Sequence, residues 1–330
     1  MTEVRILSTG VYLPEKRLTN ADLEKMVDTT DKWIVERTGI LERRIAAEED
    51  ATSDLATRAG KSALERAGLE PGALDLIVLA TISPDMLCPA TACFVQRNLG
   101  AANAAAFDIS AACSGFVYAL SMGANAIRAG QAKHVLVIGA ETMSRFTDWE
   151  DRNTCVLFGD GAGAAILAPS DEPSLLFESL GADGTLADLI ETPGGGSRNP
   201  ASPETLEKRL HYIRLKGREV FKSAVKVLES CVRKSAERLG VAIRDIDLII
   251  PHQANVRIIE AAAQRLDVPM EKMYLNVQRY GNTSGATAAI ALHEAIEENR
   301  VHPGDLIMMI TFGSGFTYAT SVIRWLGNGV

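Results

Sequence analysis

Three residues of the chain have side chains suited to acyl-transfer chemistry: Cys113, His252 and Asn282. Cys113 lies among small residues in DISAACSGFVYAL (108–120), His252 in DLIIPHQAN and Asn282 in RYGNTSGAT. A thiolate is a strong nucleophile, and imidazole and amide groups can donate hydrogen bonds to a developing oxyanion. Taken alone, a free cysteine is more often an inert buried residue. The three together favour a catalytic site.

The predicted strands and helices around these residues are consistent with a catalytic site. Residues 104–110 read as a buried strand, and a helix begins near Gly115, so Cys113 lies at a strand-to-helix turn. We expect the helix N-terminus to lower the pKa of the thiol. His252 directly follows a strand, and strand ends are where open α/β sheets present catalytic groups. Asn255 is placed to cap the helix that follows.

A faint internal repeat predicts how the turns come together. Residues 67–81 align with 239–253, and 126–141 align with 295–313 after two inserted residues. Continuous apolar runs such as DLIVLA and DLIIP are typical of strands covered on both faces. We therefore predict two similar α/β halves, 1–170 and 171–330, packed into one body. In this alignment Gly285 corresponds to Gly115, so Asn282 and Cys113 occupy equivalent turns.

Composition limits the protein class. The chain has 330 residues, 47% of them hydrophobic, and a net charge of −8, which gives no support to nucleic-acid binding. No apolar run approaches the ~20 residues of a membrane span, and MTEVRILSTG does not read as a signal peptide. The five cysteines match neither a disulfide framework nor a metal site. We expect a cytoplasmic enzyme without a metal or a membrane partner.

Two glycine-rich segments have structural interpretations. FGDGAGAAIL (158–167) lacks the Lys-Ser/Thr of a phosphate-binding loop, so we interpret it as close backbone packing. Residues 191–209 are rich in Gly, Pro and Ser and predict a long surface loop. That loop is either a tolerated insertion, which we favour slightly, or a cover over a site entrance.

The chain resembles the condensing enzymes of the thiolase superfamily, most closely the beta-ketoacyl-acyl carrier protein synthase III family. The resemblance runs from TNADLEKMVDTTDKWIVERTGI (19–40) through AACSGF, FGDGAGAA, PHQANVRI and GNTSGA to FGSGFTYA (312–319). It implies a duplicated five-layer α/β/α/β/α fold, usually in a homodimer. It also implies a decarboxylative Claisen condensation of an acyl-CoA primer, acetyl-CoA by default, with malonyl-acyl carrier protein. The products are 3-oxoacyl-acyl carrier protein, CoA and CO₂, which starts fatty acid synthesis.

The resemblance assigns roles to individual residues. Cys113 attacks the acyl-CoA thioester, and neutral His252 and Asn282 stabilise the enolate formed from the malonyl group. The backbone N–H groups of Cys113 and Ser314 form the oxyanion hole of the acyl step, although many relatives have Gly or Ala at the position of Ser314.

Further assignments concern ligands. Acyl-CoA is a substrate, and no cofactor is bound permanently. The CoA adenine lies between Trp33 and Arg152, with Thr29 and Arg37 nearby, and both flanking groups stack well on a flat base. The acyl pocket is expected to include Cys88, Phe158 and Phe312, with Cys88 reaching the partner subunit. Lys222 and Arg257 are expected to dock the acidic carrier protein; segment 207–226 contains seven Lys or Arg against two Glu.

Alternatives keep the same site. A specialised-metabolite or polyketide-type enzyme would use malonyl-CoA and need no carrier protein. A Cys-His-Asn hydrolase would release the acyl group to water. A degradative thiolase would need a second catalytic cysteine after GNTSGA, which the sequence lacks. A catalytically inactive scaffold is disfavoured because all three candidate residues are present.

Overall fold

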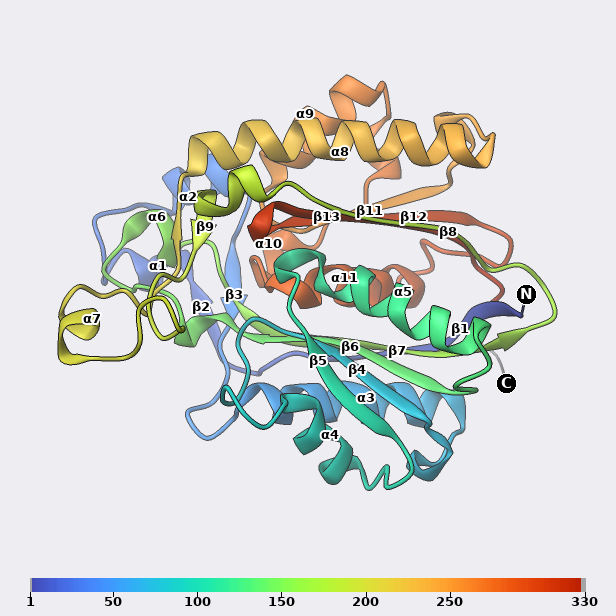
Figure 1. The fold of residues 1–330 in the computed structure, drawn as a ribbon. Helices are drawn as coiled ribbons and strands as arrows, with labels where there is room; N and C mark the ends of the chain where they lie inside the picture. The colour runs from blue at the N-terminus through green and yellow to red at the C-terminus, as the bar shows by residue number, and fades with distance from the viewer. Residues whose placement is uncertain (1, 328–330) are drawn as a thin grey trace.

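The computed structural model describes residues 2–327 and consists of five layers, helix–sheet–helix–sheet–helix (Figure 1). One outer layer holds α3 (Thr52–Ala67) and α4 (Thr91–Leu99). The central layer holds α5 (Gly115–Arg128) and α11 (Thr287–Glu297), between the two sheets. The other outer layer holds α8 (Gly217–Leu239) and α9 (Val256–Leu266). The five-layer α/β/α/β/α arrangement implied by the resemblance to the thiolase superfamily is therefore confirmed.

The two sheets have the same topology. The first has the order β1 (Glu3–Tyr12), β7 (Asp160–Ser170), β6 (Val135–Thr142), β4 (Leu76–Ala80), β5 (Ala105–Ile109). The second has the order β8 (Leu175–Ala182), β13 (Thr317–Arg324), β12 (Leu306–Gly313), β11 (Leu248–Pro251). In each sheet the parallel pairings lie toward one edge: β4 runs parallel to β5 and β6, and β11 runs parallel to β12. A bridge between Ile249 and Met273 takes the place of a fifth strand beside β11.

The duplication extends to the turns that lead into the two central helices. The 3-10 turn η2 (Ala112–Ser114) precedes α5, and η7 (Ser284–Ala286) precedes α11. Ala112 and Ser284 both have positive φ angles, 48° and 47°. Gly285 therefore corresponds to Cys113 rather than to Gly115, and the register assumed from the sequence is wrong by two residues. The turns are equivalent, as predicted, but Asn282 lies before η7 whereas Cys113 lies within η2.

Close packing of the central helices on the sheets explains the glycine-rich strand. A Cβ atom at Gly163 in β7 would lie 2.6 Å from the Cβ of Ala289 and 2.8 Å from the backbone N of Ile290, both in α11. A larger residue would push α11 off the sheet, since real Cβ atoms do not approach so closely. The interpretation of residues 158–167 as close backbone packing is confirmed.

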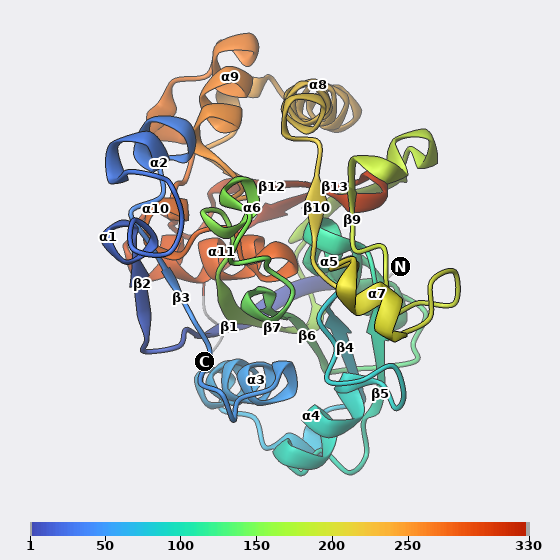
Figure 2. The same cartoon turned by 90° about the vertical axis from the view of Figure 1, so that its left-hand side faces the viewer.

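The remaining elements gather at one end of the layers, the end that faces the viewer in Figure 2. They are β2 (Arg17–Thr19), α1 (Asn20–Leu23), α2 (Asp31–Thr38), β3 (Glu42–Arg44), η3 (Met143–Arg145), α6 (Arg152–Cys155), η4 (Gly184–Leu189), β9 (Ile190–Glu191), α7 (Pro203–Glu207), β10 (Arg214–Leu215), α10 (Val277–Tyr280) and η8 (Ser314–Phe316). Three further 3-10 turns lie elsewhere: η1 (Pro71–Ala73) and η5 (Ile243–Asp245) precede β4 and β11, and η6 (Met270–Lys272) follows α9.

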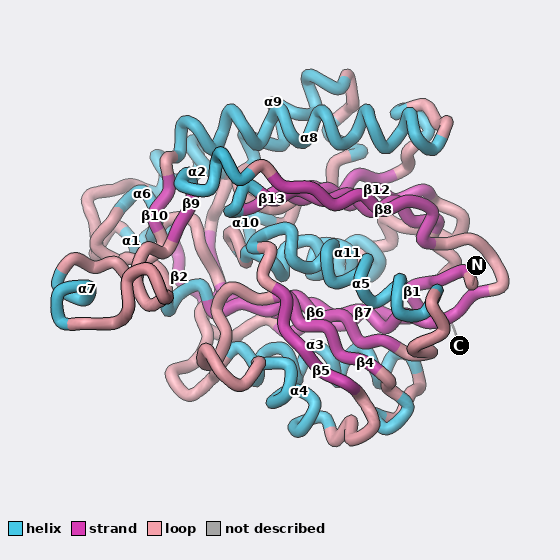
Figure 3. Tube along the Cα trace, viewed as in Figure 1, coloured by secondary structure: helices cyan, strands magenta, loops and turns pink. Residues whose placement is uncertain are grey.

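The predicted surface loop 191–209 contains the short helix α7, which projects at the left of Figure 3. Its two ends are held together because β9 pairs antiparallel with β10. Within residues 2–327, no helix has both the length and the apolar character needed to cross a bilayer.

Candidate active site

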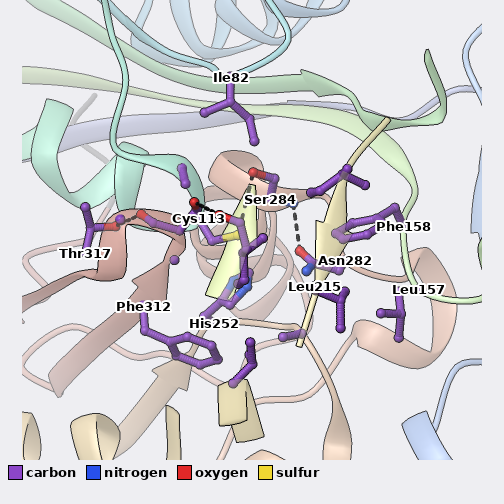
Figure 4. A pocket seen from close by; sticks show the side chains of 18 of the residues that line it. Ile82, Cys113, Leu157, Phe158, Leu215, His252, Asn282, Ser284, Phe312 and Thr317 are labelled. Carbon is purple, nitrogen blue, oxygen red and sulfur yellow. Dashed lines mark hydrogen bonds between the residues drawn. The ribbon is translucent and has the colours of Figure 1, made fainter. Parts of the chain in front are cut away.

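Cys113, His252 and Asn282 line one cavity of about 500 Å³ (Figure 4). Cys113 comes from η2, His252 follows β11, and Asn282 precedes η7, so both halves of the chain contribute. The structure brings together the three residues that the sequence analysis selected. The same cavity is lined by Ser284, which stands beside Cys113 and Asn282 in Figure 4.

Cys113 has a thiol whose environment opposes ionisation. The Sγ atom donates a hydrogen bond to Ser284 Oγ at 3.6 Å. Burial raises the pKa of Cys113 to about 12, although the hydrogen bond between Cys113 and Ser284 acts in the opposite direction. The expectation that the start of α5 would lower this pKa is therefore wrong, because desolvation of the thiolate outweighs the groups that favour it. The thiol needs a proton acceptor before it can attack.

His252 is buried, and hydrogen bonds hold both its backbone and its imidazole ring. Its backbone N–H donates to Ile310 O at 2.7 Å, and its Nδ1 lies 2.7 Å from the Thr287 hydroxyl. Burial lowers the pKa of His252 to about 3, so the ring is neutral at neutral pH. When the Thr287 hydroxyl donates to Nδ1, the ring proton is on Nε2 and is available as a donor to a ligand.

Asn282 has its amide orientation fixed by the next turn. The backbone N–H of Ser284 donates to Asn282 Oδ1 at 2.8 Å, which leaves the NH₂ group as the end that can serve a ligand. The preceding Gly281 has a φ of 65°, a conformation that glycine adopts without strain. His252 and Asn282 therefore supply two neutral hydrogen-bond donors.

The predicted oxyanion hole depends on a close approach of β12 to Cys113. A Cβ atom at Gly313 would lie 2.5 Å from the backbone N of Cys113. The absence of a side chain at Gly313 thus lets the start of η8, with the backbone N–H of Ser314, lie against the nucleophile. The Ser314 hydroxyl donates to Ile190 O in β9, so its side chain ties the cavity wall to η8.

The walls of the cavity are largely apolar. Phe158 and Phe312 both line it, as predicted for the acyl pocket. The Phe312 ring meets His252 edge to face at 5.1 Å and stacks on Phe316 at 5.8 Å. Cys88 does not line the cavity of its own chain. It is exposed on the loop between β4 and α4, beside Leu87, whose relative exposure is 88%.

The strands β9 and β10, which flank the loop 191–209, also contribute to the cavity. Ile190 and Glu191 of β9 and Leu215 of β10 line it, together with Ile213. The segment is therefore joined to the cavity wall at its base.

The residues expected to bind CoA cluster around α2: Trp33 and Arg37 lie in this helix, Thr29 precedes it and Arg152 lies in α6. The guanidinium of Arg152 lies 5.1 Å from the Trp33 ring and that of Arg37 lies 5.7 Å from it. Arg152 donates to Asp28 O at 2.8 Å, and the buried Thr29 hydroxyl has no partner among the described residues. A base stacked between Trp33 and Arg152 needs about 3.5 Å on each face, so the guanidinium must move outward to admit it.

The residues expected to dock a carrier protein lie at the rim of the cavity. Lys222 is exposed on α8 and Arg257 is exposed on α9. Their sequence neighbours Phe221 and Ile258 line the cavity. Among residues 2–327, no group of three or more His, Cys, Asp or Glu is arranged to hold a metal ion.

Three residues of the site were not selected from the sequence. Thr287 contacts His252, Ser284 contacts Cys113, and the buried Glu141 at the end of β6 contacts Ser284. Glu141 had a recognisable signal, because it is a lone acidic residue directly after the apolar run HVLVIGA. Ser284 and Thr287 are ordinary helix-start residues in sequence, so nothing marked them.

Comparison with known proteins places the chain and its fold in a family. The family model for 3-oxoacyl-[acyl-carrier-protein] synthase III matches residues 107–184, and the model for its C-terminal part matches residues 236–325. A beta-ketoacyl-[acyl-carrier-protein] synthase III from Caldanaerobacter subterraneus subsp. tengcongensis is 57% identical over 97% of both chains.

Solved structures agree with this assignment. The crystal structure of 3-oxoacyl-[acyl-carrier-protein] synthase III from Aquifex aeolicus VF5 has a TM-score of 0.90 and 51% identity, covering 98% of this chain and 100% of that one. The priming beta-ketosynthase of the R1128 polyketide pathway has a TM-score of 0.91 and 35% identity, covering 99% of this chain and 97% of that one. The chain belongs to the beta-ketoacyl-[acyl-carrier-protein] synthase III family.

Proposed function

We propose that this protein condenses an acyl-CoA primer with malonyl-acyl carrier protein, releasing CoA and CO₂ and forming a 3-oxoacyl-acyl carrier protein. The observation that carries the proposal is the meeting of one thiol with two neutral donors, His252 and Asn282, in a single cavity. Acetyl-CoA is the default primer. The reaction uses acyl-CoA as a substrate and requires no resident cofactor.

In the first half-reaction the Cys113 sulfur attacks the thioester carbonyl of acyl-CoA. The tetrahedral oxyanion accepts hydrogen bonds from the backbone N–H groups of Cys113 and Ser314. The close approach of Gly313 to the backbone N of Cys113 supports this assignment. CoA leaves as its thiol, and the acyl chain remains on Cys113 against the apolar wall that includes Phe158 and Phe312.

In the second half-reaction the malonyl thioester loses CO₂, and negative charge develops on its thioester oxygen. His252 Nε2–H and the Asn282 NH₂ group donate to that oxygen. Loss of one such preorganised donor typically costs about 10²–10³-fold in rate. A neutral histidine suits this role, since its pKa of about 3 keeps it from taking a proton in place of donating one. The resulting enolate attacks the acyl-enzyme and regenerates Cys113.

Two macromolecular partners fit the surface. Exposed Lys222 and Arg257 at the rim suit an acidic carrier protein. A second copy of the chain suits β5, an edge strand with one unpaired side on which Phe107 is 40% exposed. Leu87 protrudes from the neighbouring loop and would be covered in the same homodimer. All five cysteines are free, which supports a cytoplasmic location.

The alternative is a polyketide-type priming enzyme that uses malonyl-CoA. The R1128 ketosynthase supports it by fold, although the synthase III relatives are considerably more similar to this chain. Efficient condensation with malonyl-CoA in the absence of any carrier protein would favour that alternative.

The test is intact-protein and peptide mass spectrometry after mixing the enzyme with a series of acyl-CoA primers from two to about twelve carbons. We expect an acyl adduct on the Cys113 peptide that is absent from Cys113→Ala. Malonyl-acyl carrier protein should then discharge the adduct into a ketone product two carbons longer. A folded protein that forms no adduct with any primer would refute the proposal.

A further inference from the structure

A buried carboxylate lies behind the nucleophile. Glu141 is the next-to-last residue of the strand β6 and has no exposed surface. It accepts hydrogen bonds from three hydroxyls and three backbone N–H groups: the hydroxyls of Thr81, Ser83 and Ser284, and the N–H groups of Ile82, Ser83 and Gly285. None of the described residues places a cation against it. Burying a charged group costs free energy unless the group is paired or hydrogen-bonded. Glu141 is stabilised by its six hydrogen-bond donors.

One of those donors also touches the nucleophile. Ser284 Oγ lies 3.0 Å from Glu141 Oε1 and 3.6 Å from Cys113 Sγ. The three backbone N–H groups on Glu141 can only donate, so its oxygens serve as acceptors. The Ser284 hydroxyl therefore donates to Glu141 and accepts from the thiol. The three groups form a chain with one direction, from S–H through O–H to carboxylate.

The reaction needs such an acceptor, because burial raises the pKa of Cys113 to about 12. His252 does not supply one, since burial lowers its pKa to about 3 and its Nδ1 is occupied by Thr287. Burial lowers the pKa of His252 but raises the pKa of the Glu141 carboxyl, because in each case it disfavours the charged form. Glu141 is therefore a better proton acceptor than an exposed glutamate.

We propose that Ser284 and Glu141 form a proton relay that takes the thiol proton of Cys113 as the acyl group loads. Ser284 touches the reacting sulfur. Glu141 does not touch it and acts through Ser284, so it is a positioning residue for the thiolate. This inference rests on the proposed function, because acyl loading is the step that the relay serves.

The proton transfers balance. The Cys113 S–H bond breaks and an O–H bond forms on Ser284, while the original Ser284 O–H bond breaks and an O–H bond forms on Glu141 Oε1. The thiolate then forms the new thioester bond and the S–C bond to CoA breaks. The leaving CoA thiolate takes a proton from Ser284, which recovers one from Glu141. Free CoA thiol leaves, and both relay residues return to their starting states.

Other titratable groups near the relay do not replace it. Besides Cys113 in η2 and His252 after β11, Asp160 of β7 lies opposite Thr142, the residue that follows Glu141. The Asp160 carboxylate is occupied by Ser144 and by the Ala46 N–H. Burial raises the pKa of Asp160 as well, but Asp160 makes no hydrogen bond to Ser284 or Cys113 among the described residues.

The test compares two serine deletions on the same carboxylate. Ser284→Ala and Ser83→Ala each remove one hydroxyl from Glu141, but only Ser284 lies between Glu141 and the thiol. The measurement is the rate of Cys113 alkylation by iodoacetamide from pH 6 to 9, followed on the Cys113 peptide. It requires no acyl-CoA and therefore does not depend on the proposed function.

In the wild type the proton stays within the relay, so we expect the alkylation rate to change less than about threefold across this range. Ser83→Ala should behave in the same way. In Ser284→Ala the thiol must lose its proton to solvent, so the rate should rise about tenfold per pH unit. Acyl loading at pH 7 should fall at least about 100-fold in Ser284→Ala and less than about threefold in Ser83→Ala.

The variant Glu141→Gln tests whether Glu141 accepts the thiol proton or only repels the thiolate. If Glu141 only repels the thiolate, its neutralisation raises the alkylation rate at every pH; if it accepts the proton, the steep pH dependence of Ser284→Ala appears. A faster Glu141→Gln, or equal profiles for the two serine variants, would overturn the relay. Should Glu141→Gln not fold, the serine pair decides. A flat wild-type profile without any acyl-CoA adduct would uphold the relay and refute the proposed function.

Discussion

The Nδ1 atom of His252 lies 2.7 Å from the Oγ1 atom of Thr287, the first residue of α11. The start of a central helix thus holds the ring in the tautomer that donates from Nε2. Thr287 is itself buried, and its hydroxyl has no other partner among the described residues. The orientation of His252 therefore depends on one hydroxyl from the helix that both sheets share.

We expect Thr287→Val to slow decarboxylation of the malonyl substrate, because the ring loses the donor that fixes its tautomer. The loss should be about tenfold, the equivalent of one hydrogen bond of about 1.4 kcal/mol. Acyl loading on Cys113 should be unchanged, since it uses the backbone oxyanion hole. Separate assays of the two half-reactions would check this, with Thr287→Ser as the rescue variant. Equal losses in both half-reactions would show that Thr287 supports the fold instead.

Buried His252 should make the fold sensitive to acid. Its pKa is about 3 in the native protein against 6.5 for a free histidine, so the unfolded chain binds a proton that the native state excludes. Stability is therefore lost as the pH falls below 6.5, by about 1.4 kcal/mol per pH unit from this group. Denaturant melts between pH 7 and 5 should show a smaller loss in His252→Gln than in the wild type. His302→Gln, a change on the surface, should keep the wild-type slope; an unchanged slope in His252→Gln would contradict the prediction.

Patterns in the sequence predicted the two α/β halves and the turns that carry the three central residues, because buried strands and the polar residues near their ends are visible as patterns. The five-layer arrangement was implied by the resemblance to the thiolase superfamily. His252 after DLIIP is such a case, and Glu141 after HVLVIGA shows that the same rule could have been applied once more.

The sequence pattern could not predict how deeply each catalytic side chain is buried or which groups surround it. The direction of the Cys113 pKa shift was predicted from the helix start, but it depends on how much water the packed turn excludes. The role of Ser284 depends on a φ of 47° that aligns its hydroxyl with both Cys113 and Glu141, and no local sequence signal specifies that angle for a serine.

Gly313 should be intolerant of any side chain. A Cβ atom there would lie 2.5 Å from the Cys113 backbone N, so Gly313→Ala must displace either η2 or the start of η8. Both carry a donor of the proposed oxyanion hole, and we expect acyl loading to fall by about 100-fold or more. The matched control is Gly196→Ala, where a Cβ meets nothing within 4 Å. Rapid-quench loading assays and thermal melts would decide; near wild-type loading in Gly313→Ala would contradict the proposed oxyanion hole.

Reversing the two rim charges should separate the half-reactions. Lys222→Glu combined with Arg257→Glu should weaken the use of malonyl-acyl carrier protein at least about tenfold and leave acyl-CoA loading within about twofold. The effect should shrink as salt is added, because exposed charges are screened. Lys234→Glu with Arg238→Glu makes the same change of charge farther along α8 and should affect neither step. Equal losses in both steps would count against the docking role.

Cys88 should limit primer length only through a partner subunit. It is exposed, does not line the cavity of its own chain, and lies beside the protruding Leu87 on a loop near the edge strand β5. If a second copy pairs along β5 and this loop enters the partner's acyl pocket, as the family resemblance implies, Cys88→Phe would fill space there. Adducts with primers longer than about six carbons should then fall at least tenfold relative to acetyl, while the acetyl adduct persists.

The same acyl-CoA series with Cys93→Phe, a change at the other exposed cysteine, is the control. Sedimentation measurements would establish that both variants keep the oligomeric state of the wild type, because a broken dimer would also change the profile. An unaltered chain-length profile in dimeric Cys88→Phe would exclude Cys88 from the pocket. A shift seen only in Cys88→Phe would mean that each cavity is completed by its partner, since in a single chain the residue lies outside the cavity.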